Sequence, residues 1–297
     1  MLAKVLLGDC TELLRLDLPR QLGLSGPLAL TFLDPPFNQG KDYQYCDDAM
    51  PQAQYWEWMG HICAQVHSLT VEGGALYFMQ REKNAEHVLR CLRQAGWSLQ
   101  NIIVWMKRTS AVPGASRYGK QYQIIAFGTK GPRARVFHRL RIDLPPRLEH
   151  KQRRDHGVFL TDCWDDIREL TSGYFAGDEA LRAPDGARFH KQQAPVALLL
   201  RILLSSTDPG DIVLDPFAGT GTTLVVAEQL GRPSIGIEID PANARMMRSR
   251  LEAPRKADSV LRHRHYYRFT PDLDHIWPPP PSTCKQAPSP MKGIPHD

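Results

Sequence analysis

A carboxylate, two prolines and an aromatic residue follow one another at Asp34-Pro35-Pro36-Phe37. They come directly after Ala29–Leu33, an apolar run typical of a buried strand. Because proline has a fixed φ and no N–H, the two prolines end the strand in a stiff turn and hold the Asp34 carboxylate and the Pro35 carbonyl in fixed directions. Two acceptors beside an aromatic face suit a planar molecule with an exocyclic amino group. The pattern alone is also compatible with a turn that only ends a core strand.

A second pattern, near the other end of the chain, is typical of a nucleoside site. The loop 216–223 is rich in glycine, and Gly219 and Gly221 permit positive φ and a close approach of the backbone to a ligand. Glu238 follows about twenty residues later, where an acidic residue can bind both ribose hydroxyls. The loop is neither a GxGxxG fingerprint nor a P-loop. It carries Asp215 and no basic residue, which disfavours pyrophosphate and favours a cationic ligand such as S-adenosylmethionine.

The two patterns in this order resemble the amino-methylating DNA methyltransferases of the β arrangement, the bacterial modification methylases. In that family the catalytic motif comes first and the S-adenosylmethionine motif comes near the end. The segments that carry the resemblance are Gly8-Asp9-Cys10, Asp34-Pro35-Pro36-Phe37, Ile103-Val104-Trp105-Met106-Lys107, the block 209–223 and the strand end 236–240.

The resemblance implies a role for each matched residue. The catalytic residues would be Asp34, Pro35, Pro36 and Phe37, with the Asp34 carboxylate and the Pro35 carbonyl on the target amine and Phe37 stacked on a flipped base. Glu238 would hold the ribose of the cofactor, S-adenosyl-L-methionine, and Asp9 its adenine. The complete set expected at the cofactor is Asp9, Cys10, Asp215, Phe217, Ala218, Gly219, Thr220, Gly221, Thr222, Thr223, Glu238 and Ile239.

The chemistry that we expect is methyl transfer to the exocyclic N6 of adenine in duplex DNA, at a specific site and by base flipping. An amine conjugated with the ring is a poor nucleophile, and two acceptors can stabilise the charge that develops on it. An Asp rather than a Ser at position 34 favours adenine by the resemblance. Cytosine N4 stays open, because either base offers an amine and a π-face.

Two departures from the family pattern bear on these roles. Ala194 stands where the family usually has a lysine, in Lys191-Gln192-Gln193-Ala194-Pro195, and Tyr122-Gln123 stands where the family often has His-Glu. They leave open how the cofactor is anchored and how the substrate loop makes its contacts, and neither removes the catalytic group.

The elements that must position these residues alternate between strand and helix. Strands are expected at 5–9, 29–33, 75–79, 99–106, 123–127, 211–215 and 234–240, and helices at 11–18, 54–69, 82–95, 196–204, 224–230 and 241–251. Residues 38–52 read as a polar loop. This order predicts an α/β protein with a doubly wound, Rossmann-like methyltransferase sheet in which the motif order is circularly permuted, and in which the late strands can pair antiparallel.

The regular alternation stops between residues 129 and 189, where arginines are frequent. We expect residues 1–128 to form the catalytic part of the α/β domain, 129–189 an irregular, basic target-recognition insertion, 190–254 the cofactor part of the same domain, and 255–297 a basic and then proline-rich tail, disordered from Trp277 on. The residues expected to contact DNA are Lys107, Arg108, Arg117, Lys120, Arg133, Arg135, Arg139 and Arg141.

The composition gives further expectations about the partner, metal binding and location of the protein. The 297 residues carry a net charge of +5, which suits a polyanionic partner. The six cysteines lack metal-ligand spacing, so we expect no metal and reduced thiols in a cytoplasmic protein. The sequence contains no apolar run of ~18 residues, so it predicts no membrane-spanning helix. The expected partner is double-stranded DNA; a cognate restriction endonuclease and the choice between monomer and homodimer stay open.

Two other classes of function also stay open. The first is an RNA, protein or small-molecule amino-methylase, because a Pro-Pro-aromatic turn also suits other planar amides. The second is a catalytically inactive relative that binds DNA or a partner protein. The basic insertion favours nucleic acid over the first, and the intact Asp34 and glycine loop argue against the second.

Overall fold

An eight-stranded sheet forms the centre of the protein. The computed structural model describes residues 2–43, 45–109, 113–143, 156–170, 177–183, 185–190 and 192–279. Across the sheet the strand order is β1-β12-β11-β2-β5-β7-β6-β10, and only β7 runs against the others. The strands are β1 Ala3–Leu7, β2 Leu28–Leu33, β5 Ala75–Arg81, β6 Trp97–Met106, β7 Tyr122–Lys130, β10 Cys163–Trp164, β11 Ile212–Asp215 and β12 Ser234–Glu238.

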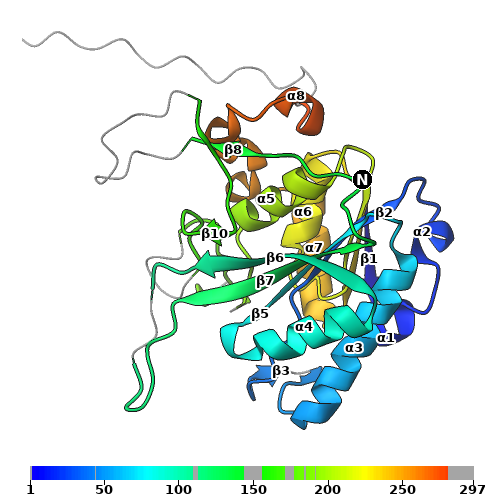
Figure 1. The fold of residues 1–297 in the computed structure, drawn as a ribbon, viewed down its shortest axis with the longest axis vertical. Coiled ribbons are helices and arrows are strands. Elements are labelled where there is room, and N and C mark those ends of the chain that lie inside the picture. The colour runs from blue at the N-terminus through cyan, green and yellow to red at the C-terminus, as the bar shows by residue number, and fades with distance from the viewer. Residues whose placement is uncertain are drawn as a thin grey trace, which may run out of the picture.

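The two ends of the chain interleave in this sheet. Strands β11 and β12, from the C-terminal part, lie between β1 and β2 from the N-terminal part (Figure 1). Their parallel pairing, with Leu7 opposite Glu238 and Thr31 opposite Leu214, brings the ends of four strands to one edge. The permuted motif order is therefore compatible with one continuous Rossmann-like sheet, as the sequence predicts.

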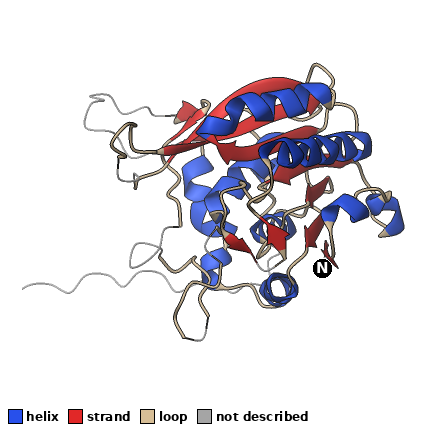
Figure 2. Ribbon diagram, turned by 90° about the horizontal axis from the view of Figure 1, so that it is seen from below, coloured by secondary structure: helices blue, strands red, loops and turns tan. Residues whose placement is uncertain are grey.

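Helices cover both faces of the sheet (Figures 1 and 2). Leu30 and Phe32 of β2 belong to the core that includes α5 and part of α6, whereas Leu33 belongs to the core that includes α3 and α4. Side chains of a strand alternate between faces, so a strand buried on both sides reads as a continuous apolar run. The main helices are α3 Gln52–Leu69, α4 Ala85–Gln94, α5 Val196–Ser206, α6 Thr222–Gln229 and α7 Pro241–Glu252.

Two local predictions are wrong. The helix expected over 11–18 is instead two single turns, α1 Cys10–Leu13 and α2 Leu18–Gln21. A proline ring clashes with the preceding helical turn and has no N–H to donate, so a helix over 11–18 could not continue through Pro19. Pro19 instead sits in the first turn of α2, where a proline is tolerated. The polar loop expected over 38–52 contains a small antiparallel ribbon, β3 Asp42–Tyr43 and β4 Cys46–Asp47.

The basic insertion packs on the main core. Its short strands β8 Arg141–Ile142 and β9 Val158–Phe159 pair with each other, and β10 extends the main sheet beside β6. Buried side chains of this region, among them Leu140, Ile142 and Trp164, join the same core as α5. The segment thus lacks a separate core of its own within the described residues. Residues 144–155 and 171–176, with Arg147, Lys151, Arg153 and Arg154, lie outside the described residues.

The end of the described chain also differs from the prediction. Residues 255–279 fold into two 3₁₀ helices, Lys256–Asp258 and Val260–Tyr267, and α8 Leu273–Ile276. Trp277, expected in a disordered tail, is 1% exposed and packs in the core near Tyr267. Proline-rich composition after position 277 hid this buried anchor, and residues 280–297 lie outside the described part.

Candidate active site

Two cavities meet at the edge of the sheet where β2 and β11 end. The larger, of about 410 Å³, runs from Asp34 to the ends of β1 and β12. The smaller, of about 280 Å³, lies toward β6 and the insertion. The residues that line both are Asp34, Phe37, Gln192, Gln193 and Ala194. Asp34 therefore stands in the wall that the two cavities share.

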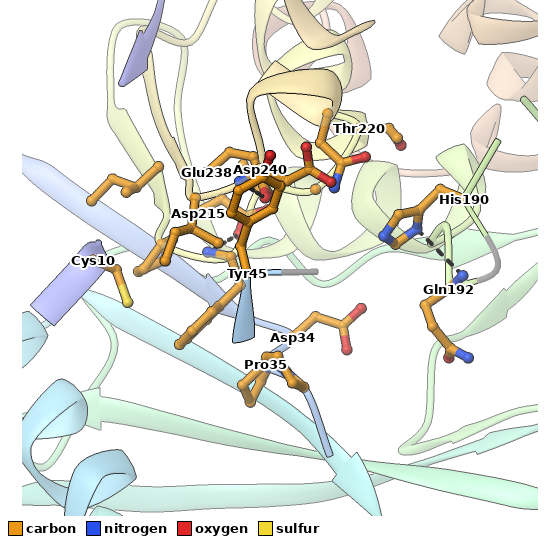
Figure 3. Close-up of a pocket in the computed structure, with 18 of the residues that line it drawn as sticks. Cys10, Asp34, Pro35, Tyr45, His190, Gln192, Asp215, Thr220, Glu238 and Asp240 are labelled. Carbon is orange, nitrogen blue, oxygen red and sulfur yellow. Dashed lines mark hydrogen bonds between the residues drawn. The ribbon is translucent and has the colours of Figure 1, made fainter. Parts of the chain in front are cut away.

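The turn after β2 is held by its second proline. The carbonyl of Pro36 accepts a hydrogen bond from the Tyr55 hydroxyl at 2.7 Å, and the Gln80 amide donates to the same hydroxyl at 3.0 Å. Among the described residues, no group donates a hydrogen bond to the Asp34 carboxylate or to the Pro35 carbonyl. The turn is thus fixed on one side and presents two unpaired acceptors on the other. In Figure 3 the Asp34 oxygens point into the open space above the turn.

Burial dominates the electrostatics of Asp34. It raises the pKa of this carboxyl to about 8, and the Asp215 carboxylate adds to the shift, while Lys107 and Lys41 oppose it. A low-dielectric surrounding disfavours the charged form unless a cation or a donor compensates it. The site therefore favours a ligand that brings positive charge or N–H groups to Asp34.

Phe37 forms the aromatic part of the shared wall. Its side chain is only 8% exposed and packs in the same core as Phe32 and Trp105. Packing fixes the plane of the ring, and the ring still borders both cavities. The smaller cavity also has Trp105 and Met79 in its wall, which suits a flat apolar ring.

Asp215 plays a different part from Asp34. Its carboxylate accepts hydrogen bonds from the backbone N–H of Phe217 at 3.1 Å and from the Thr223 hydroxyl at 2.5 Å. Burial raises its pKa to about 7. The two bonds tie the strand end to the loop and to the start of α6, so Asp215 shapes the loop and lines the cavity at once.

The two loop glycines are needed for different reasons. Gly221 has φ of +82°, and a Cβ there would lie 2.2 Å from Cγ of Met247 in α7. Gly219 has φ of +53°, and a Cβ there would meet nothing closer than the His190 ring at 3.9 Å. Gly221 therefore serves the packing of the loop on α7, and Gly219 leaves the cavity open.

Glu238 closes the far end of the larger cavity. Its carboxylate accepts the N–H of Asp240 at 2.8 Å, and hydrogen bonds from Asn243 and Gly219 partly offset the rise in its pKa that burial causes. The Glu238 carbonyl accepts the N–H of Gly8 at 2.9 Å, which brings Asp9 to the same place. Asp9 caps α1 through the N–H of Thr11.

The larger cavity collects nearly the whole predicted cofactor set. All four residues of the Asp34–Phe37 turn line it, as do the predicted cofactor residues Asp9, Cys10, Asp215, Phe217, Ala218, Gly219, Thr220, Thr222, Thr223, Glu238 and Ile239. Gly221 is absent from the lining because it faces Met247. Figure 3 shows Cys10, Asp34, Asp215 and Glu238 around one space.

Several lining residues carry no sequence signal of their own. Lys41, Trp58, His190 and Asn243 line the larger cavity without belonging to either motif. Burial, with Arg188 and Lys41 nearby, lowers the pKa of His190 to about 4, so this imidazole is neutral at pH 7. The departure Ala194 borders both cavities, and the buried Gln123 borders the smaller one.

Half of the basic residues expected to contact DNA lie at the edge of the sheet that holds the cavities. Lys107 and Arg108 follow β6, and Arg117 and Lys120 precede β7. Arg81 and Lys83, at the end of β5, are two further cations that the sequence did not predict. Burial lowers the pKa of Lys83, and the positive charges of Arg81, Lys120 and Arg117 lower it further. Lys120 pairs with Glu82 at 3.2 Å.

Arg139 and Arg141 lie on the insertion. Both guanidinium groups stack on Phe159, at 4.5 and 4.2 Å from the ring centroid. Arg141 also donates to the carbonyl of His156 at 2.8 Å, so it holds the β8–β9 ribbon together. Arg139 is exposed and is the freer of the two.

Arg133 and Arg135, which the sequence predicts to contact DNA, lie away from the cavities. They follow the end of β7, and the N–H of Arg135 donates to the carbonyl of Gly73, just before β5 begins. Since β5 and β7 are antiparallel, this is the opposite edge of the sheet from the cavities. The Arg135 side chain also pairs with Asp211, which precedes β11. We therefore remove both from the expected DNA surface.

The described residues contain neither a candidate metal site nor a membrane-spanning helix. No group of three or more His, Cys, Asp or Glu side chains is arranged to hold a metal ion. None of the described helices is long and apolar enough to cross a membrane.

Comparisons with known proteins agree with the fold and the motifs. Residues 28–249 match the model of the N6/N4 DNA methylase family. The chain is similar to the DNA adenine methyltransferase YhdJ of Escherichia coli K12, with 31% identity over 239 residues that cover 75% of this chain and 76% of the relative.

Two solved structures have the same fold. The complex of M1.HpyAVI with SAM superposes with a TM-score of 0.53 at 20% identity and covers 84% of this chain and all of its own. The cytosine-N4-specific PvuII DNA methyltransferase superposes with a TM-score of 0.59 at 18% identity and covers 86% of this chain and 88% of its own.

Proposed function

This chain belongs to the N6/N4 DNA methylase family, and from that premise we propose that it transfers the methyl group of S-adenosylmethionine to the exocyclic amine of a base in double-stranded DNA. One observation carries the proposal. The Asp34 carboxylate and the Pro35 carbonyl accept no hydrogen bond from the described residues; both residues line the larger cavity, and Asp34 also lines the smaller one. One cavity suits the cofactor, and the other suits the base.

The larger cavity fits S-adenosylmethionine. The charged residues in its lining are mostly acidic, and its histidine is neutral, so a sulfonium and an ammonium group find favourable charge there. The acidic residues are Asp9, Asp34, Asp47, Asp215, Glu238 and Asp240, and the cation is Lys41. Glu238 would hold the ribose hydroxyls, and the open backbone at Gly219 would allow the amino-acid part to pass closely. When bound there, the cofactor supplies an electrophilic methyl group.

The smaller cavity would receive the base. A base inside a duplex cannot reach a buried carboxylate, so the enzyme must turn it out of the stack. Phe37 offers a fixed ring face for stacking, and Trp105 and Met79 provide the apolar wall. The amine of the base would then reach Asp34, which lines both cavities, and would lie beside the cofactor cavity.

The residues of the turn act on the amine by position and charge. Asp34 and the Pro35 carbonyl each accept one N–H, which directs the nitrogen lone pair across the shared wall toward the larger cavity. Both acceptors stabilise the positive charge that develops on nitrogen. The Asp34 carboxyl, whose pKa is about 8 in the free protein, can afterwards take the proton that the methylated nitrogen loses.

We favour adenine N6 as the acceptor, with cytosine N4 as the alternative. An Asp at position 34 supports adenine by family resemblance, and YhdJ, whose name specifies adenine, is 31% identical. The PvuII enzyme is cytosine-N4-specific and has the same fold, so the fold does not separate the two bases. The basic edge formed by Arg81, Lys83, Arg117 and Lys120 would approach the DNA backbone.

The first experiment offers tritiated S-adenosylmethionine with duplex DNA, RNA or mixed protein to the purified chain. We expect label in duplex DNA alone, and sequencing of modified bases in DNA from cells that express the protein should show N6-methyladenine in one short sequence. N4-methylcytosine in that sequence would show instead that cytosine, the alternative, is the methylated base. Label in RNA or protein only, or in nothing although S-adenosylmethionine binds, would overturn the proposal.

A further inference from the structure

Arg188 is a half-buried cation, and the fold leaves two of its nitrogens without a partner. Its Nη1 donates to the carbonyl of Leu170 at 2.6 Å, whereas Nε and Nη2 are buried and have no hydrogen-bond partner in the described part of the chain. Buried polar groups without partners are rare, and a charged one is especially unfavourable. Arg188 borders the smaller cavity together with Asp34 and Phe37. Two of its donors thus lie unpaired in a residue of the wall of that cavity.

The carboxylates of the same cavity do not satisfy Arg188. Glu169 is occupied, because its oxygens accept the backbone N–H of Arg108 at 3.0 Å and that of Thr109 at 2.9 Å, and also the Thr109 hydroxyl. Asp34 forms no ion pair with Arg188. The cavity thus holds a free donor pair and a free carboxylate that are not paired with each other.

The backbone fixes Arg188 in this position. It lies at the base of a small turn in which the N–H of Ala183 donates to the carbonyl of Ala187 at 2.8 Å. The next residue, Phe189, donates to the carbonyl of the buried Leu181 at 2.9 Å. Since the backbone and Nη1 are both anchored, little freedom is lost when a ligand binds the other two nitrogens.

The complement of these groups is a nitrogen heterocycle with an amidine edge, –N=C–NH₂. The amine donates to Asp34 and to the Pro35 carbonyl, and the ring nitrogen beside the amino-bearing carbon accepts from Arg188. Adenine carries this edge at N1 and N6, and cytosine carries it at N3 and N4, with O2 as a further acceptor beside N3. Thymine has no exocyclic amine and presents no such edge.

We propose that Arg188 binds the flipped base through the ring nitrogen next to the reactive amine, N1 of adenine, and so sets the angle at which the amine meets Asp34. This inference rests on the function proposed above. Arg188 does not border the larger cavity, so we expect it to contact the base and not the cofactor.

A cycle of protein and substrate changes tests the contact. Duplexes carry the methylated sequence with adenine, 1-deazaadenine or 7-deazaadenine at the target position, and kcat/KM is measured for the wild type and for Arg188→Met. With adenine, Arg188→Met should lose on the order of 10- to 100-fold, the value of a hydrogen bond from a charged donor. With 1-deazaadenine, which lacks the acceptor, the same variant should lose little. 7-Deazaadenine should behave like adenine.

Matched controls separate the contact from folding. Arg182→Met changes the neighbouring arginine of the same turn, which bonds to the carbonyl of Gly186 and lies outside both cavities, and it should leave all three rates unchanged. The affinity of Arg188→Met for S-adenosylmethionine, measured by calorimetry, should equal that of the wild type.

The outcomes that count against the inference are distinct from those that count against the proposed function. An equal loss for Arg188→Met with adenine and with 1-deazaadenine would show that Arg188 does not contact N1. If the wild-type protein methylates no duplex, the proposed function itself is wrong. If cytosine is the methylated base, a cycle with 3-deazacytosine replaces the first and must show the same coupling.

Discussion

Neighbouring strands β2 and β11 end at the same edge, where Asp215 is the last residue of β11 and Asp34 directly follows β2. Asp215 accepts two hydrogen bonds from its own loop, whereas Asp34 accepts none from the described residues. Burial raises the pKa of both. The same residue type in the same environment thus serves the fold in one strand and stands free for a ligand in the next. The hydrogen bonds, and not burial or pKa, distinguish the two roles.

The largest effect should come from Asp34→Ala. Removing one of two acceptors that hold the amine should lower the rate of methyl transfer by on the order of 10³-fold or more. Binding of S-adenosylmethionine should fall no more than several-fold, because only the attraction of Asp34 for the sulfonium is lost and the other residues of the larger cavity keep their hydrogen bonds. Single-turnover transfer of labelled methyl to the cognate duplex measures the first, and calorimetry the second.

The melting temperature gives Asp34→Ala an internal control. The carboxyl is desolvated and unpaired, so its removal should leave the melting temperature unchanged or raise it. A variant that unfolds more easily would place Asp34 with Asp215 among the residues that hold the loop, and the contrast between the two strands would be lost. A variant that retains full activity would remove Asp34 from the reaction.

Asp215→Ala should have the opposite profile. It leaves the Phe217 N–H and the Thr223 hydroxyl unpaired at a site that is 3% exposed, which should destabilise the protein by about 3 kcal/mol. The melting temperature should fall by several degrees, and the affinity for S-adenosylmethionine should fall with the order of the loop. Thr223→Val, which removes only one of the two bonds, should show a smaller change in the same direction. A stable Asp215→Ala protein that binds the cofactor normally would contradict the assigned role.

The contrast between these strands also shows how far the sequence reaches. Apolar runs predicted the main strands and helices because elements buried in the sheet core have few alternatives. The antiparallel β7 was left open, since strand direction depends on the connection and not on the strand itself. Short elements were not predicted correctly: β10 has two residues, and the helix expected over 11–18 is two separate turns, the second of which begins at Leu18 and includes Pro19.

The site follows the same rule. The strand-end motifs predicted Asp34, Glu238 and the glycine loop, because their chemistry is local in sequence. Arg188 could not be predicted, because its partnerless state depends on Glu169 being satisfied by another segment. Arg135 was assigned to DNA for the opposite reason, since its partner Asp211 is distant in sequence. An arginine-rich sequence does not specify which of its charges are already paired.

Proton release on cofactor binding should reveal both carboxyls. With pKa values of about 8 for Asp34 and about 7 for Asp215, each holds a proton part of the time near pH 7. A sulfonium in the same cavity favours the ionised forms, so S-adenosylmethionine should bind several-fold more tightly at pH 8 than at pH 6. Calorimetry in buffers of different ionisation enthalpy counts the protons. S-Adenosylhomocysteine, which lacks the sulfonium charge, should release fewer, and equal release would contradict this account.

The raised pKa values of Asp34 and Asp215 also predict whether the free energy of unfolding rises or falls with pH. Between about pH 4 and pH 8 the folded protein holds protons on these carboxyls that the unfolded chain has lost, so the free energy of unfolding should fall as pH rises through that window. Asp34→Ala should make this slope shallower, and urea unfolding at pH 6, 7 and 8 measures it. An unchanged slope would mean that Asp34 does not keep its proton in the folded state.

The smallest effects should separate the two edges of the sheet. Arg117 lies at the edge with the cavities, and Arg135 lies at the opposite edge, paired with Asp211. Arg117→Gln should weaken DNA binding a few-fold and lower the slope of log K against log salt by about one, because one phosphate contact is lost. Arg135→Gln removes the same charge from the chain and should leave the slope unchanged. Equal changes in both would mean that only the net charge matters, and that the DNA does not follow the edge where the strands β2 and β11 end.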